Sequence, residues 1–183
     1  MKILYIKHGM HLKNHNAMMS YKNITLYVIE NPDILNKIDL SQFDCVYSPQ
    51  MPIDVNKYPN TKFIFGPHFS VFPEKQQMDL IRRDNVTYVQ PSTWVVDLWK
   101  SFPICNNIKI KPLPFGVDTN KFNNIKPITE RNNVIIYFKH RNPTDLVLIE
   151  NYMKSKSINY IVFSYDIKYN ENDYINCLQD AKF

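Results

Sequence analysis

The chain has 183 residues, of which 44% are hydrophobic and 21% charged, a balance that excludes an intrinsically disordered protein. Its formal charge of +5 suits an anionic partner such as a nucleotide or a phosphate. The basic residues are scattered, however, and form none of the basic runs with interleaved aromatics found in nucleic-acid binders. No apolar run approaches the roughly 20 residues that cross a bilayer. The N-terminus lacks a signal-peptide cleavage site, so we expect a cytoplasmic protein without a membrane span.

Short β-branched and aromatic runs that end in turn residues dominate the first two thirds of the chain. They predict strands at residues 2–6, 24–29, 45–47, 62–65, 86–89 and 108–110. Helix-like stretches occupy residues 73–82 and 92–102, and the second is predicted to bury one stripe containing Trp94, Val95, Leu98 and Trp99. Strands that alternate with helices predict right-handed βαβ units. We therefore expect residues 1–118 to form an α/β domain with a Rossmann-like, doubly wound parallel sheet.

A polar stretch without periodicity, residues 119–133, is predicted to be an interdomain linker. The alternating pattern then restarts with strands at 134–139 and 160–164 and helices at 143–154 and 172–180. Residues 181–183 resemble the start of a third strand. Two parallel strands and two helices cannot cover both faces of a sheet. Residues 134–183 are therefore expected to be an incomplete second Rossmann-like unit that leans on the first domain, pairs with another chain or is truncated.

Only three glycines occur in the chain, and each follows a predicted strand: Gly9, Gly66 and Gly116. In an open α/β sheet, ligands bind in the crevice at the carboxyl ends of the strands. Glycine there lets the backbone adopt positive φ and approach a ligand closely. The alternative is that these glycines serve the strand-to-loop turns themselves, and the sequence leaves both interpretations open.

Residues 114–122 read Pro-Phe-Gly-Val-Asp-Thr-Asn-Lys-Phe. This segment resembles the boundary motif of retaining GT-B enzymes of glycosyltransferase family 4, in which a strand is followed by Pro-x-Gly-Val-Asp, two variable residues and Phe. Residues 86–99 are similar to the strand–Ser–helix unit that precedes that motif. Residues 63–68, Phe-Ile-Phe-Gly-Pro-His, are similar to the strand whose final histidine contacts the donor sugar. Residues 134–141 look like the first strand of the C-terminal domain, with a Lys-His-Arg ending found among large DNA viruses and some bacteria.

The resemblance implies a retaining hexosyltransferase: an acceptor-side N-terminal domain and the truncated start of a nucleotide-sugar domain. It implies a nucleoside diphosphate sugar as donor, a glycan or other hydroxyl compound as acceptor, and no metal or other cofactor. His68 would be the catalytic residue near the donor sugar, although it could instead be a loop histidine stacked on a nearby Phe. Lys139 and Arg141 would hold the diphosphate, unless they are merely a solvated strand end. The ligand-lining residues would be His8, Gly9 and Gly116. A viral origin would place the protein in the host cytoplasm.

The family's downstream acidic motif, two Glu separated by seven residues, does not occur before Phe183. Whether this chain alone is an enzyme therefore stays open. The alternative from another class is a non-catalytic glycan- or nucleotide-binding module, or a partner subunit that forms an oligomer or complements another chain. Nucleic-acid binding through net charge is a third, disfavoured hypothesis. The spacing of His8, His11 and His15 suggests a metal site, but no carboxylate or Cys lies near them. We interpret that segment as the loop after the first strand and expect no bound metal.

Overall fold

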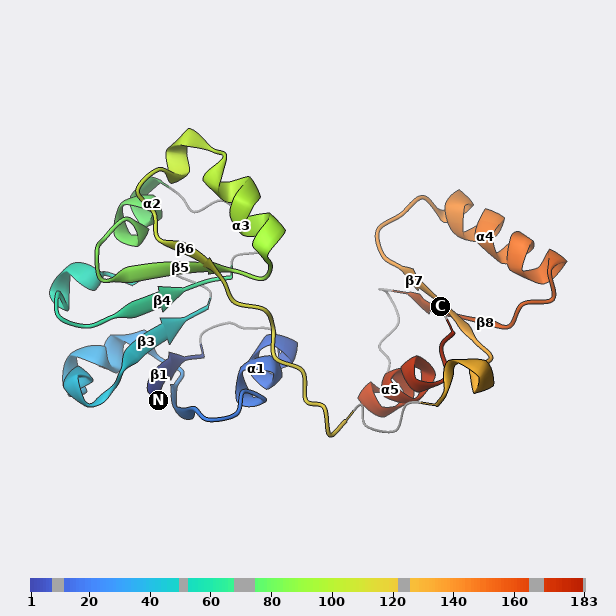
Figure 1. Ribbon diagram of the computed structural model, residues 1–183, viewed down its shortest axis with the longest axis horizontal. Coiled ribbons are helices and arrows are strands. Elements are labelled where there is room, and N and C mark those ends of the chain that lie inside the picture. Colours follow the sequence, from blue (N-terminus) through green and yellow to red (C-terminus); the bar gives the residue numbers. More distant parts are fainter. Residues whose placement is uncertain (8–11, 50–52, 68–74, 122–125, 165–169, 183) are drawn as a thin grey trace. The chain divides into compact units, whose positions relative to one another are not determined.

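The computed structural model describes residues 1–7, 12–49, 53–67, 75–121, 126–164 and 170–182 (Figure 1). The chain forms two compact units, Met1–Val117 (unit 1) and Asp118–Phe183 (unit 2). Among the described helices, none has both the length and the apolar character required to cross a membrane.

Unit 1 is built on a six-stranded sheet with strand order β2-β1-β3-β4-β5-β6, in which all neighbours are parallel (Figure 1). The strands are β1 Lys2–Ile6, β2 Thr25–Ile29, β3 Cys45–Ser48, β4 Phe63–Phe65, β5 Val86–Gln90 and β6 Ile110–Pro112. The predicted α/β architecture with a Rossmann-like parallel sheet is therefore confirmed. The first five apolar runs form strands within one residue of their predicted bounds, whereas the sixth was placed too early, because β6 begins at Ile110 and ends at Pro112. The buried run of β3 lies inside the sheet, whereas β2 is an edge strand and stays half exposed.

The strand order reverses between β1 and β3. From β1 the chain moves outward to β2 and then crosses to the other side of β1 to form β3. This arrangement creates a topological switch point at the carboxyl ends of β1 and β3, where the connections leave in opposite directions.

The helices of unit 1 are α1 Leu12–Met19, α2 Lys75–Ile81 and α3 Thr93–Lys100. The prediction of a loop through His15 was wrong, because α1 begins at Leu12. The sequence of α1 is mostly polar and shows no apolar period. The helix is anchored instead by Met18, which is buried, and by His15, whose ring stacks on Tyr5 at 5.7 Å between centroids.

The prediction of one buried stripe on α3 was wrong in part. Val95, Val96 and Trp99 are buried, but Trp94 is 68% exposed and Leu98 is 48% exposed. At about 100° per residue, positions i, i+1 and i+4 share one side of a helix. The side of α3 that carries Val95, Val96 and Trp99 packs against the sheet. Trp94 and Leu98 therefore lie on the neighbouring stripe and face solvent.

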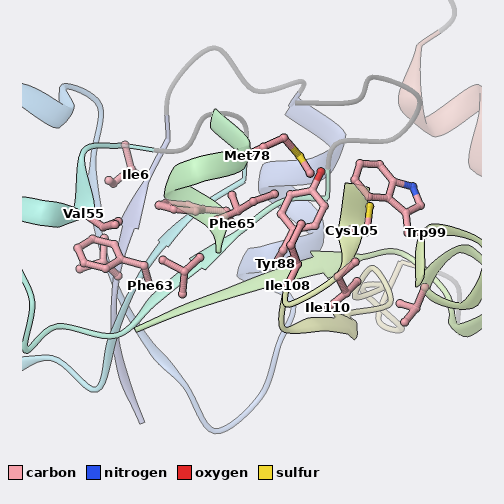
Figure 2. Packing of buried hydrophobic residues seen from close by; sticks show 14 of the residues in the cluster. Ile6, Val55, Phe63, Phe65, Met78, Tyr88, Trp99, Cys105, Ile108 and Ile110 are labelled. Carbon is pink, nitrogen blue, oxygen red and sulfur yellow. The ribbon is translucent and has the colours of Figure 1, made fainter. Parts of the chain in front are cut away.

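Two hydrophobic clusters cover the two faces of this sheet. In cluster 1, Phe63, Phe65 and Tyr88 come from β4 and β5, and Met78 of α2 and Trp99 of α3 pack with them (Figure 2). Cluster 2 comprises Ile3, Tyr5, Met18, Cys45, Tyr47 and Val89, with α1 as its helix. Alternation along each strand produces this division, because successive side chains point to opposite faces.

Unit 2 contains the parallel pair β7 Val134–Phe138 and β8 Tyr160–Ser164, with helices α4 Pro143–Ser155 and α5 Glu171–Gln179. Ala181 forms a parallel bridge with Asn133, at the place where the sequence suggested a further strand. Among the described residues of this unit, only Phe163 and Ile175 are buried hydrophobic residues.

Part of the predicted linker is tied to unit 2. Lys126 Nζ lies 2.6 Å from Asp180 Oδ1, and the Arg131 guanidinium donates to the carbonyl oxygens of Lys126 and Ala181. Residues 126–133 were read as linker because they are polar and lack a period. In the structure, their polar groups instead bond to the end of α5 and the residues after it.

Candidate functional site

The carboxyl edge of the unit 1 sheet is the first candidate site. Because all six strands are parallel, their carboxyl ends meet along one edge, which includes the switch point between β1 and β3. The described residues there include Lys7 after β1, Ser48 at the end of β3, Gly66 after β4 and Gln90 at the end of β5. The predicted site residues His8, Gly9 and His68 lie outside the described residues.

Gly66 is required by the protein's own backbone. Its φ is +100°, and a Cβ at this position would lie 2.4 Å from the carbonyl oxygen of Val89 in the neighbouring strand. A side chain would therefore be strained in conformation and would also clash with β5. This geometry supports the turn interpretation of the glycine.

Gly116 lies against the end of α1. A Cβ there would come within 2.5 Å of both the Ala17 carbonyl oxygen and the Ser20 Oγ. The Tyr21 hydroxyl donates a hydrogen bond to the carbonyl oxygen of Pro114 in the same segment. The space that a side chain would need is thus filled by α1, and the boundary motif is held to unit 1 by this contact.

Lys7 and His15 lie at the switch point. Lys7 Nζ is 3.4 Å from Glu30 Oε1, an ion pair that joins the ends of β1 and β2. Burial, and secondarily the Lys7 charge, lowers the pKa of His15, while Glu30 acts in the opposite direction. The imidazole is therefore neutral at physiological pH, with one ring nitrogen as a hydrogen-bond donor and the other as an acceptor. Sequence reasoning considered His15 only as a metal ligand.

Gln90, at the end of β5, and Ser92, directly before α3, were not among the predicted site residues. Gln90 is fully buried, and neither atom of its amide group has a hydrogen-bond partner in the part of the chain that the structure describes. Ser92 precedes α3 as its N-cap residue, yet its buried Oγ makes no hydrogen bond there either. The signal in the sequence was a glutamine that ends an otherwise largely apolar strand, directly before Pro91 and Ser92.

In unit 2, Lys139 and Arg141 lie in the loop between β7 and α4, and both side chains are exposed. Asn142 caps α4 by accepting a hydrogen bond from the Thr144 N–H at 3.0 Å. The N-terminus of a helix carries partial positive charge, and Lys139 and Arg141 add two cations beside it, against the single acidic residue Asp145 in the first turn of α4. Arg141 also lines a pocket of about 480 Å³ between β7 and α4. Lys139 and Arg141, the two residues predicted to hold a diphosphate, therefore lie in the same short loop.

No group of three or more His, Cys, Asp or Glu side chains that could hold a metal ion occurs among the described residues. The chain matches no protein-family model, no curated protein and no solved structure.

Proposed function

We propose that this chain is the acceptor-side unit and the beginning of the donor-side unit of a retaining, nucleotide-sugar-dependent glycosyltransferase with GT-B organisation. One observation carries the proposal. A Rossmann-like parallel unit is followed, beyond the boundary motif at 114–122, by a second parallel β-α unit whose first loop presents Lys139 and Arg141. Cations at the carboxyl end of a parallel strand, before a helix N-terminus, form a typical environment for a diphosphate.

In the proposed reaction, the bond between the anomeric carbon and the diphosphate breaks as the acceptor hydroxyl oxygen bonds to that carbon. The hydroxyl proton passes to a diphosphate oxygen, and the new bond forms on the face that the diphosphate leaves. Negative charge grows on the departing diphosphate during this step. Lys139 and Arg141 would stabilise that charge through charge-assisted hydrogen bonds. Electrostatic stabilisation of developing charge by fixed donors is usually the largest single contribution to catalysis. His68 would lie near the reacting sugar.

Calorimetric titration of the chain with UDP, GDP and their common sugar derivatives tests this proposal. We expect micromolar-to-millimolar binding of at least one nucleotide, weakened about tenfold or more by either Lys139→Ala or Arg141→Ala, since a charged hydrogen bond contributes about 1.5–3 kcal/mol. Lys154→Ala is the matched control, because it removes an exposed cation from the opposite end of α4.

Equal weakening by Lys154→Ala would mean that net charge alone attracts the nucleotide. Failure of every nucleotide to bind would contradict the donor-site proposal for this chain. Neither result would bear on the other candidate site, the carboxyl edge of unit 1.

A second candidate is a non-catalytic glycan- or nucleotide-binding module that another chain completes. The exposed apolar side chains of α4 favour it, since Val147 is 52%, Leu148 63% and Tyr152 57% exposed. Large exposed apolar side chains on one helix are typical of an interaction surface. Nucleotide binding without transfer from any donor sugar to any acceptor would favour this candidate over the enzyme.

A further inference from the structure

The amide group of Gln90 poses a physical problem in unit 1. A carboxamide offers two N–H donors and an acceptor oxygen, and burying it without partners costs free energy. Gln90 has 0% of its surface exposed, and within the described chain its Nε2 and Oε1 lack partners. Buried polar groups of native proteins are nearly always hydrogen-bonded. A strand position that keeps such a group therefore points to a polar partner from outside the fold.

The direction of the Gln90 side chain follows from the pleat of β5. Val86, Tyr88 and Gln90 alternate onto one face, and Val86 and Tyr88 belong to cluster 1, to which α3 contributes. The ring centroids of Tyr88 and Trp99 lie 5.2 Å apart, which places α3 over this face. Because α3 starts at Thr93, three residues after Gln90, the amide lies beneath the N-terminal end of α3.

The same helix end provides further donors. Ser92 is the N-cap residue of α3, with φ −153° and ψ 161°, but its side chain does not cap the helix. By contrast, Asn142 and Asn170 cap α4 and α5 with their side chains. The first-turn N–H groups of an α-helix have no partners within the helix. Pro91 and Ser92, which follow Gln90 in the chain, keep part of their surface exposed.

We propose that Gln90, Ser92 and the first turn of α3 form a recess that binds the hydroxyl groups of a neutral sugar. A hydroxyl group both donates and accepts, as a carboxamide and a serine hydroxyl do, so paired hydroxyls satisfy every atom of the amide. An anion only accepts and would leave Oε1 facing negative charge. Neither Gln90 nor Ser92 carries a charge that would attract an anion. The role of this recess as the acceptor subsite of a transferase rests on the proposed function. The binding of a sugar to the recess does not depend on that proposal.

Replacement of Gln90 by methionine, which has a similar length and no amide, is the first test. Exchanging an unpaired buried polar group for an apolar one of the same shape is neutral or stabilising. We expect Gln90→Met to raise the thermal midpoint of unit 1, followed by tryptophan fluorescence of the full chain, by roughly 2–4 °C. Gln42→Met is the matched control, since Gln42 is exposed and donates to the Asp39 carbonyl oxygen, and it should give no rise.

Ligand-observed NMR of the full chain with glucose, galactose, mannose and N-acetylglucosamine is the second test, with inorganic phosphate as the competing probe. We expect millimolar binding of at least one sugar, weakened about tenfold or more by Gln90→Met and several-fold by Ser92→Ala. Ser101→Ala, at the opposite end of α3, should bind like the original chain. Its hydroxyl donates to the Leu98 carbonyl oxygen and is not part of the recess.

A lower thermal midpoint in Gln90→Met would show that the amide has a partner within the fold and would overturn the inference. Sugar binding unchanged by both variants, or binding of phosphate instead of sugar, would overturn it as well. These outcomes are independent of the nucleotide titration. If the chain binds a sugar but no nucleotide, the sugar-binding recess is supported and the transferase proposal fails.

Discussion

Burial governs the titration of three side chains in cluster 2. Loss of hydration raises the pKa of Tyr5 to about 12 and, with a smaller contribution from Asp44, that of Cys45 to about 11. Burial also raises the pKa of Tyr47 well above its ordinary value. All three groups are therefore neutral at physiological pH, and cluster 2 is expected to tolerate acid better than alkali.

We predict that Cys45 makes the chain less stable as the pH rises from about 9 to about 11. The thiol of the unfolded chain ionises near 9.0, whereas the folded thiol keeps its proton to about 11. In this window the unfolded state binds fewer protons, so the free energy of unfolding falls with pH, by up to about 2 kcal/mol from this group. Urea unfolding across this range in reducing buffer measures the loss.

Cys45→Ala is the control, because it removes the thiol and leaves the tyrosines. The alanine variant will be less stable at neutral pH through its cavity, but its alkaline loss should be shallower. Parallel pH curves for the two proteins would show that the thiol contributes nothing to the alkaline loss.

At the scale of an element, α4 ends in a motif that lacks its preferred residue. The Ile158 N–H donates to the Met153 carbonyl oxygen at 3.0 Å, and the Ser157 N–H donates to that of Lys154 at 3.1 Å. These are the two hydrogen bonds of a Schellman motif, and Ser157 adopts the left-handed conformation with φ 52°. Glycine is the residue that adopts this conformation without steric cost.

We predict that Ser157→Gly stabilises unit 2 by up to about 1 kcal/mol, since it removes the left-handed strain of a residue with a Cβ. Ser155→Gly, two residues earlier and inside the helix, should instead destabilise the unit by about 0.5 kcal/mol. Circular dichroism at 222 nm during urea unfolding, at about 25 °C, measures both changes. A destabilising Ser157→Gly would mean that the serine side chain makes a compensating contact.

At the scale of the whole molecule, the two units differ in the size of their cores. The buried hydrophobic residues of the described chain belong to unit 1 except for Phe163 and Ile175. Hydrophobic burial is the main source of folding free energy, at about 25 cal/mol per Å² of apolar surface. Unit 2 is therefore expected to be the less stable of the two.

We predict that the two units unfold in separate steps, with unit 2 first. Both tryptophans, Trp94 and Trp99, lie in unit 1, so fluorescence reports only that unit, whereas circular dichroism also reports α4 and α5. The dichroism curve should begin to fall at lower urea than the fluorescence curve. Ser157→Gly should shift only this early phase. Coincident curves would instead show that the two units unfold together.

The strands of this protein could be predicted from local composition. Runs such as Phe63–Phe65 and residues 45–47 carry apolar side chains at successive positions, as strands buried on both faces of a sheet do. The motif at 114–122 likewise coincides with the division between the units. The loop that carries Lys139 and Arg141 could be predicted as well, because it follows a strand and precedes a helix in the sequence itself.

Other features depended on contacts between segments that are distant in the sequence. The polar helix α1 forms because His15 and Met18 pack on the sheet, and the buried side of α3 was chosen by the shape of the strands beneath it. The position of Gln90 beneath α3 follows from strand alternation and from the packing of Tyr88 on Trp99. Local sequence thus determined where the strands lie, through the burial that their residues require. The tertiary structure decided which polar groups are buried without partners, because that depends on which surfaces meet.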